Sequence, residues 1–205
     1  MLIYNNAMQK PKAIIFDCFG VLVESSLIPF NNRHFSGDTN KLETSAALDN
    51  AANKGDITHP QFVEKVSNLA GISVEQANQE LDTNPPNVRL LTYIKEVLKP
   101  HYKIGFLSNA SDNWLASLFT PDQLALFDDF VLSYEHGMAK PEAAIYGLAA
   151  KRLGVAAADS IFIDDVPAYC DAARKFGMQS IVYSRFETFK TELETLLGVN
   201  WQLRC

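Results

Sequence analysis

Five short apolar runs punctuate the chain, and each is followed by polar or turn-forming residues. They are Lys12 to Phe16, Lys103 to Leu107, Phe130 to Ser133, Ser160 to Ile163 and Gln179 to Tyr183. A short apolar run bounded by turn signals is typical of a strand that is buried on both faces. We therefore predict five strands, and we expect the first to end at Asp17.

Helical periodicity fills the chain between the later runs. One apolar stripe predicts a helix from Asn87 to Lys99 that Pro100 closes, and another predicts a helix from Pro141 to Leu153 that stops at Gly154. Strand and helix thus alternate from about residue 87 onward. Such alternation favours parallel strands joined by right-handed crossover helices. The sequence predicts an α/β fold, a Rossmann-like doubly wound parallel sheet.

The stretch from about Glu24 to Pro86 breaks this rhythm, because it contains no convincing strand. Its stop and cap residues indicate three helices: Asn40 to Asn53 before Gly55, Pro60 to about Gly71 after Thr58, and one whose capping box is Ser73 with Gln76. We predict a helical cap domain of residues 22–90, inserted into a core domain of residues 1–21 and 91–205. The hinges are expected near Val23 and Pro85.

The composition excludes several classes of protein. The 205 residues are 47% hydrophobic and 20% charged, as in ordinary globular chains. A net charge of −6 repels polyanions, so we expect no nucleic-acid partner. No window approaches the roughly 20 apolar residues of a membrane span, and the start, MLIYNNAMQKPK, lacks a basic stretch followed by a long apolar one. We expect a cytoplasmic protein without a membrane partner.

Polar groups follow three of the predicted strands. Asp17 ends the first, Ser108 and Asn109 follow the second, and Asp164 with Asp165 follows the fourth. Lys140 stands at the start of a predicted helix. Ligands of open parallel sheets bind where the carboxyl ends of the strands converge, so these side chains are candidates for one site. Each alone has an ordinary reading as a turn, a cap or a solvated lysine.

Together and in this order, four segments resemble the haloacid dehalogenase superfamily of aspartate-nucleophile hydrolases over nearly the whole chain. The segments are FDCFGVL (residues 16–22), FLSNAS (106–111), GMAKPEAAIY (137–146) and FIDDVPAYCDAARKFGM (162–178). Within that superfamily, LSYEHGMAKPEAAIY and the inserted cap are similar to the small bacterial sugar-phosphate phosphatases that include α-D-glucose-1-phosphate phosphatase.

The resemblance implies a Mg²⁺-dependent phosphomonoesterase acting on small phosphorylated metabolites, with sugar phosphates favoured. Asp17 would be the nucleophile, forming an aspartyl-phosphate that water then hydrolyses. The implied cofactor is a Mg²⁺ ion held by Asp17, the backbone carbonyl of Phe19, Asp164 and Asp165. Ser108 and Asn109 would bind the phosphoryl oxygens, and Lys140 would offset their charge.

One departure concerns the proton of the leaving group. Most phosphatases of this superfamily carry a second aspartate two residues after the nucleophile, and here that position is Phe19. General acid–base catalysis contributes roughly 10²- to 10⁴-fold, so its loss slows the reaction without removing the nucleophile. Either the leaving group needs little help, or another group supplies the proton, for which His34, His59 and Glu24 are the side chains to inspect.

Two alternatives stay open. An aromatic residue at position 19 also resembles the haloacid dehalogenases, although the Asp164–Asp165 pair speaks against a metal-free enzyme. The chain could also be an impaired binding or regulatory module, which Phe19 and Tyr169 permit, since the family often has asparagine at position 169. The three cysteines, Cys18, Cys170 and Cys205, show no paired spacing and no evident histidine base, so a thiol nucleophile is not expected.

Overall fold

A computed structural model describes residues 10–199 of the chain. Its centre is a five-stranded parallel sheet in the order β3-β2-β1-β4-β5. The strands are β1 Ala13–Phe16, β2 Lys103–Ser108, β3 Asp129–Leu132, β4 Ser160–Asp164 and β5 Gln179–Val182. All five predicted strands are present, and the predicted α/β class is confirmed.

The central strand β1 is buried on both faces of the sheet. Ile14 and Phe16 join one apolar cluster, while Ala13 and Ile15 join a second cluster on the opposite face. Successive side chains of a strand point to opposite faces, so a strand covered on both sides has no polar positions. This covering explains the continuous apolar run before Asp17.

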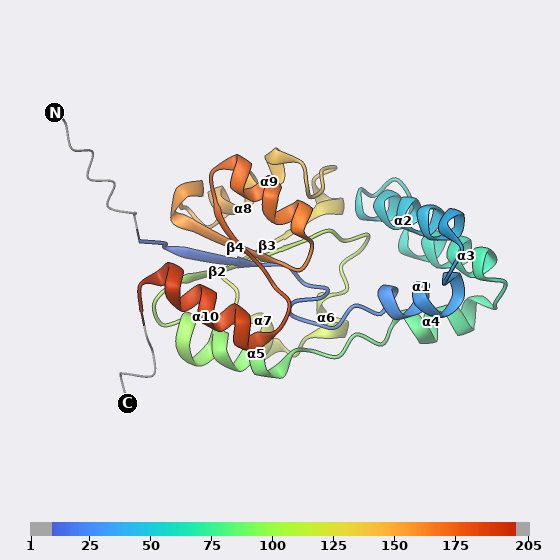
Figure 1. The fold of residues 1–205 in the computed structure, drawn as a ribbon, viewed down its shortest axis with the longest axis horizontal. Coiled ribbons are helices and arrows are strands. Elements are labelled where there is room, and N and C mark those ends of the chain that lie inside the picture. The colour runs from blue at the N-terminus through green and yellow to red at the C-terminus, as the bar shows by residue number, and fades with distance from the viewer. Residues whose placement is uncertain (1–9, 200–205) are drawn as a thin grey trace.

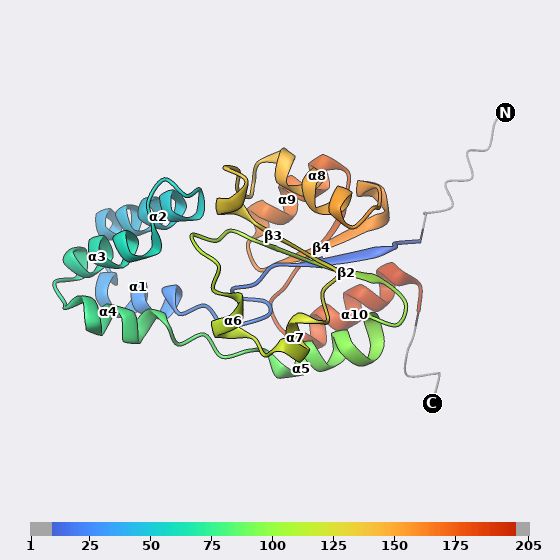
Figure 2. The same ribbon diagram turned by 180° about the vertical axis from the view of Figure 1, so that it is seen from behind.

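Helices cover both faces of the sheet (Figures 1 and 2). One face carries α8 Ala143–Arg152 and α9 Pro167–Phe176, with Ile145 and Ala173 in its cluster. The other carries α5 Val88–Tyr93, the π-helical turn Ile94–Leu98 and α10 Phe186–Leu197. Short elements complete the core: α6 Leu115–Leu118, α7 Pro121–Leu124, and 3₁₀ turns Ser133–Glu135 and Ala157–Asp159.

The strand order places a topological switch point beside β1. The chain passes from β1 to β2 and β3 on one side, then crosses to β4 and β5 on the other. Ligand sites of open parallel sheets lie where the strand order reverses in this way. We therefore expect a site at the carboxyl ends of β1 and β4, which are paired in register from Ala13 with Ser160 to Phe16 with Ile163.

Four helices between β1 and α5 pack on one another beyond the carboxyl ends of the strands (Figure 1). They are α1 Leu27–Phe35, α2 Thr39–Asn53, α3 His59–Ala70 and α4 Val74–Leu81. Phe30, Phe35, Phe62 and Val66 are among the residues of a separate apolar cluster. The helices thus have a core of their own, and treating residues 22–90 as a separate domain stays a proposal.

The two chain segments that join this helical unit to the sheet lie side by side. Val23 and Pro86 form an isolated antiparallel bridge, flanked by hydrogen bonds from Glu24 N to Pro85 O (3.1 Å) and from Asn87 N to Leu22 O (2.8 Å). Both predicted hinge positions, near Val23 and near Pro85, fall in this paired segment.

The helix signals were right in part. Thr58 and Gln61 form a full capping box for α3, and Ser73 caps α4. The second half of the predicted α4 capping box is wrong: the Gln76 side chain accepts no hydrogen bond from the Ser73 backbone N–H, and Gln76 Nε2 donates to Glu80 Oε1 (3.1 Å). Helix α8 begins at Ala143 rather than at Pro141, and the helix predicted over residues 87–99 changes to a π-helical turn after Tyr93.

Within residues 10–199, no helix is long and apolar enough to cross a membrane. Cys205 lies outside the described residues.

Gly105 on β2 provides a test of how closely the sheet packs on α8. A Cβ atom there would lie 2.7 Å from Leu153 Cδ1 and 3.1 Å from Ile15 Cγ1. Gly105→Ala should lower the free energy of unfolding by about 1–3 kcal/mol, because added volume in a filled core forces its neighbours apart. Urea denaturation measures this loss. Leu153→Val in the same chain should restore part of it, and an unchanged midpoint for Gly105→Ala would contradict the packing.

Candidate active site

Acidic side chains from the first and fourth motifs meet at the switch point. Asp17 directly follows β1, and its backbone N–H donates to Ile163 O of β4 (2.9 Å). Asp164 ends β4, and Asp165 follows it. One carboxylate oxygen from each of the three residues can be chosen so that all lie within 4.8 Å of one another. Residues nearly 150 positions apart in the sequence therefore share one site.

Lys140 joins two of these acids. Its Nζ lies 2.7 Å from Asp17 Oδ1 and 2.6 Å from Asp164 Oδ2, and the residue is 2% exposed. The ammonium also lies 5.0 Å from the centre of the Tyr169 ring. We call Asp17, Lys140, Asp164 and Asp165 the carboxylate–lysine cluster.

Burial and mutual repulsion set the protonation of the cluster. Burial raises the pKa of Asp17 to about 7, although Lys140 lowers it, and the charges of Asp164 and Asp165 raise it further. The pKa of Asp165 is raised as well, chiefly by burial. Burial lowers the pKa of Lys140, but Asp164 and Asp17 outweigh this and hold it above its ordinary range. The two carboxylates therefore favour the charged form of Lys140.

The donor set fits the magnesium ion that the resemblance implies. With its acids ionised, the cluster has three negative charges and one positive charge, so two negative charges are left for a divalent cation to balance. Lys140 occupies one oxygen of Asp17 and one of Asp164, and the other Asp164 oxygen accepts from Val166 N (2.8 Å). Asp17 Oδ2 and the Asp165 carboxylate remain for a hard cation, which prefers oxygen ligands.

Gly20 makes room for Asp165. A Cβ at position 20 would lie 2.3 Å from Asp165 Oδ2, and the backbone has φ +82°. Both the close approach and the left-handed conformation favour glycine. The Cys18 carbonyl accepts hydrogen bonds from the N–H groups of Val21, Leu22 and Val23, which closes the loop tightly. These contacts explain why glycine follows Asp17 so closely in FDCFG.

Asn109 holds the backbone of Lys140. Its Nδ2 donates to Lys140 O (3.0 Å), and its Oδ1 accepts from Lys140 N (2.8 Å). The neighbouring Ser108 is buried, and its hydroxyl donates to Asn109 O (3.1 Å). The structure thus gives Asn109 a positioning role toward Lys140, while the predicted binding of phosphoryl oxygens by Ser108 and Asn109 stays a prediction.

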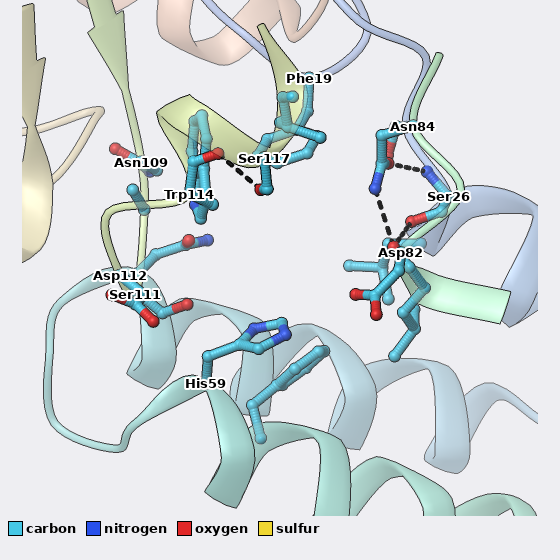
Figure 3. A pocket seen from close by; sticks show the side chains of 17 residues that line it. Phe19, Ser26, His59, Asp82, Asn84, Asn109, Ser111, Asp112, Trp114 and Ser117 are labelled. Carbon is cyan, nitrogen blue, oxygen red and sulfur yellow. Dashed lines mark hydrogen bonds between the residues drawn. The ribbon is translucent and has the colours of Figure 1, made fainter. Parts of the chain in front are cut away.

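A cavity of ≈ 430 Å³ lies beside the cluster, between the core and the four-helix unit (Figure 3). Two neighbours of the cluster line this cavity: Phe19, which stands two residues after Asp17, and Asn109, which is hydrogen-bonded to the Lys140 backbone. The four members of the cluster are not among the lining residues. The Phe19 ring packs edge-on against Trp114, with the centroids 4.9 Å apart. The cavity wall is therefore aromatic at position 19, where most phosphatases of the superfamily carry the second aspartate.

The helical unit is held against the core along the cavity rim. The Ser133 hydroxyl donates to Asn53 O at the end of α2 and accepts from Ala110 N (2.8 Å). Lys54 Nζ lies 3.4 Å from Glu142 Oε1. Because Asn53 and Ala110 both line the cavity, these contacts help to set its width.

Only one of the three candidate proton donors reaches the cavity. His59 lines it and points into it from the start of α3 (Figure 3). His34 Nε2 lies 2.8 Å from Glu80 Oε2 instead, within the helical unit, and Glu24 is exposed outside the lining.

The two described cysteines are poor nucleophiles. Burial raises the pKa of Cys170 to about 11, and burial also holds the pKa of Cys18 well above its ordinary value. Both thiols are buried, and Cys170 Sγ donates to backbone carbonyls of Asp164 and Ile181. These features agree with the expectation that no thiol attacks a substrate.

Sequence reasoning missed several side chains of the cavity wall, among them Asn53, Asp82, Asn84, Asp112 and Trp114. None lies in a motif with a fixed spacing. They come from α2, the end of α4 and the loop after β2, so only the packing of these elements brings them together. Asp49, one turn before Asn53 on α2, was also missed: burial raises its pKa to about 6, and Asn53 Nδ2 donates to it.

Comparisons with known proteins agree with this geometry. A family model described as haloacid dehalogenase-like hydrolase matches residues 11–177. Acyl-CoA dehydrogenase family member 10 of Mus musculus is 36% identical over 160 residues, and bifunctional epoxide hydrolase 2 of Sus scrofa is 36% identical over 73 residues. The matches cover 71% and 36% of this chain, and they span only 14% and 13% of those proteins.

Solved structures share the fold. A haloacid dehalogenase family enzyme of Bacteroides thetaiotaomicron has a TM-score of 0.70 and 23% identity, covering 90% of this chain and 99% of that chain. The same enzyme in complex with magnesium and inorganic phosphate has a TM-score of 0.65 and 24% identity, covering 85% and 94%. A dehalogenase solved as an intermediate complex has a TM-score of 0.67 and 17% identity, covering 94% and 99%.

The charge balance of the cluster is open to test with Lys140→Met. The substitution leaves Asp17 and Asp164 buried without a cation, and without added divalent ions it should lower the free energy of unfolding by about 3–5 kcal/mol. Urea denaturation monitored by circular dichroism measures it. Lys99→Met, which removes a partly exposed pair with Asp128 at 2.7 Å, is the control and should cost about 0–1 kcal/mol. Equal losses in the two variants would contradict the buried ion cluster.

Proposed function

The chain belongs to the haloacid dehalogenase-like hydrolase family, and on this premise we propose that it is a magnesium-dependent phosphomonoesterase of small phosphorylated metabolites. The family assignment makes it a hydrolase. The finer assignment rests on one observation, the meeting of Asp17, Asp164 and Asp165 around the Lys140 ammonium at the switch point. Sugar phosphates are the substrates that the motif resemblance favours.

In the proposed reaction Asp17 is the nucleophile. A carboxylate oxygen attacks the phosphorus atom, the bond from phosphorus to the ester oxygen breaks, and the alcohol leaves with a proton. Water then attacks the aspartyl-phosphate and releases inorganic phosphate, which restores the Asp17 carboxylate. Lys140 holds Asp17 Oδ1 at 2.7 Å and so fixes the orientation of the carboxylate before attack.

Asp17, the backbone carbonyl of Phe19, and Asp165 would hold the magnesium ion, with Asp164 beside them directly or through water. When bound, the ion would neutralise the repulsion between the attacking carboxylate and the phosphoryl oxygens. The enzyme of Bacteroides thetaiotaomicron solved with magnesium and inorganic phosphate supports this assignment by analogy of fold. Ser108 would donate to the phosphoryl group, and Asn109 would keep Lys140 directed toward it, in keeping with its two bonds to the Lys140 backbone.

We assign the proton of the leaving group to His59. Phe19 has no proton to give, and the departing alcohol must extend into the cavity that Phe19 lines. His59 points into the same cavity and is a side-chain type commonly used in general acid–base catalysis (Figure 3).

A haloacid dehalogenase remains the second candidate because an aromatic residue stands at position 19. A halide leaves without protonation, so that reaction would need neither His59 nor a metal ion. The three carboxylates speak against it, because Lys140 offsets only one of their charges. Without a further cation, Asp164 and Asp165 raise the pKa of the attacking Asp17 and reduce the fraction of its carboxylate form. An impaired binding module would lack both activities.

The Asp17→Asn variant tests the nucleophile. Hydrolysis of p-nitrophenyl phosphate and acetyl phosphate should require Mg²⁺ in the wild type and should fall at least 10³-fold in the variant, while the circular dichroism spectrum is retained. Asp122→Asn, an exposed carboxylate on α7, is the matched control and should keep full activity. Undiminished turnover in Asp17→Asn would refute the assignment. Chloride release from 2-chloropropionate in the presence of chelator would support the dehalogenase instead.

Leaving groups of graded basicity test His59. In the wild type the rate should depend little on the pKa of the leaving alcohol, whereas His59→Gln should lose about 10²-fold on alkyl phosphates and little on p-nitrophenyl phosphate, whose phenolate leaves without help. His34→Gln, a histidine of the helical unit outside the cavity, is the control. Equal losses on both kinds of ester would show that His59 does not donate the proton.

A further inference from the structure

Apart from His59, the proton donor of the proposed reaction, the charged side chains of the cavity are carboxylates. Asp82 and Asp112 line it, His59 is the third titratable group, and among the described lining residues there is no lysine or arginine. Asp82 follows the end of α4 in the helical unit, and Asp112 lies in the loop after β2 of the core, so the two carboxylates belong to different walls (Figure 3). An occupant of the cavity therefore meets negative charge from both sides.

Neither carboxylate has an ion-pair partner in the part of the chain that the structure describes. Within residues 10–199, no lysine, arginine or histidine lies within ion-pair distance of Asp82 or Asp112. Asp112 Oδ1 accepts a hydrogen bond from the backbone N–H of Asn113 (2.6 Å). Their charge thus faces the cavity and the solvent that fills it.

The described cations near the site are engaged elsewhere. Lys140 is bound to Asp17 and Asp164, and Lys54, the residue after the lining residue Asn53, pairs with Glu142. At the end where the phosphoryl group would bind, the carboxylates thus have Lys140 as a counter-charge, whereas Asp82 and Asp112 have no ion-pair partner among residues 10–199.

We propose that Asp82 and Asp112 act as a charge filter, which admits phosphomonoesters with an uncharged leaving group and rejects those that carry a second anionic group. This inference rests on the proposed phosphatase function and narrows its substrates. The remaining polar wall suits an uncharged, hydroxylated group, since it is made of neutral hydrogen-bonding side chains: Ser25, Ser26, Asn53, Asn84, Ser111 and Ser117. Trp114 and Phe19 offer apolar surface for its carbon skeleton.

The expected size of the effect follows from Coulomb's law. Two unit charges about 6 Å apart in a water-filled cleft change an equilibrium by roughly threefold, and by more where the dielectric constant is lower. Each carboxylate should therefore contribute about three- to tenfold discrimination against an anionic leaving group. Added salt should weaken the effect, because these carboxylates are accessible to solvent.

A matched pair of esters tests the filter. Glycerol 3-phosphate and 3-phosphoglycerate differ only by a hydroxymethyl group in place of a carboxylate. The wild type should show a kcat/KM at least tenfold higher for glycerol 3-phosphate, mostly through KM, and this ratio should shrink in 0.5 M NaCl. Asp82→Asn and Asp112→Asn should each reduce the ratio about threefold, and Asp112→Lys should reduce it further. Asp122→Asn on α7 is the control and should leave the ratio unchanged.

The outcomes separate the filter from the proposed function. Turnover of both esters with a ratio near one, or a ratio that Asp82→Asn and Asp112→Asn leave unchanged, would overturn the filter while the phosphatase stands. No turnover of either ester or of p-nitrophenyl phosphate would overturn the phosphatase and the filter with it. The salt dependence is measured on the wild type and needs no folded variant: a ratio that 0.5 M NaCl leaves unchanged would also overturn the filter.

Discussion

The ion cluster around Lys140 is the constraint on which the rest of the site depends. Burying an ammonium or a carboxylate alone is costly, so the two must meet, and here one ammonium lies within 2.7 Å of two carboxylates. This requirement ties together three segments: the loop after β1, the end of β4 and the segment before α8. The sheet brings the first two segments together by pairing β1 with β4. Asn109 holds the third segment in place through two hydrogen bonds to the backbone of Lys140.

The cluster keeps an excess of negative charge, and this excess gives it a chemical use. With its three carboxylates ionised and one ammonium, the cluster has a net charge that a divalent cation would balance. Gly20 shows how closely the surrounding loop is fitted, since any Cβ there would collide with the Asp165 carboxylate. The loop is closed by three hydrogen bonds to the Cys18 carbonyl, which hold it in this tight conformation.

Both parts of the chain, the core and the helical unit, line the cavity. The core holds the carboxylate–lysine cluster, and the helical unit supplies His59, Asp82 and part of the polar wall of the cavity. Contacts such as Ser133 to Asn53 fix how far the two parts are separated. Both parts of the chain therefore contribute to the space beside the cluster, and substitutions in the helical unit can change the cavity wall without changing Asp17.

Much of this could be predicted from the sequence because the signals are local. A strand buried on both faces must be apolar throughout, so β1 was visible as a run ending at Asp17, and Thr58 with Gln61 marked the start of α3. The residue types of the four motifs, three aspartates and a lysine among them, likewise indicated from the sequence which side chains could form a charged site. The π-helical turn after Tyr93 and the Gln76 side chain, which bonds Glu80 rather than its own cap, depend on neighbours and left no local signal. Only the tertiary structure decided that His59 rather than His34 reaches the cavity, that Asn109 holds Lys140, and that Asp82 and Asp112 face one space, because distances between side chains on separate elements are set by how those elements pack.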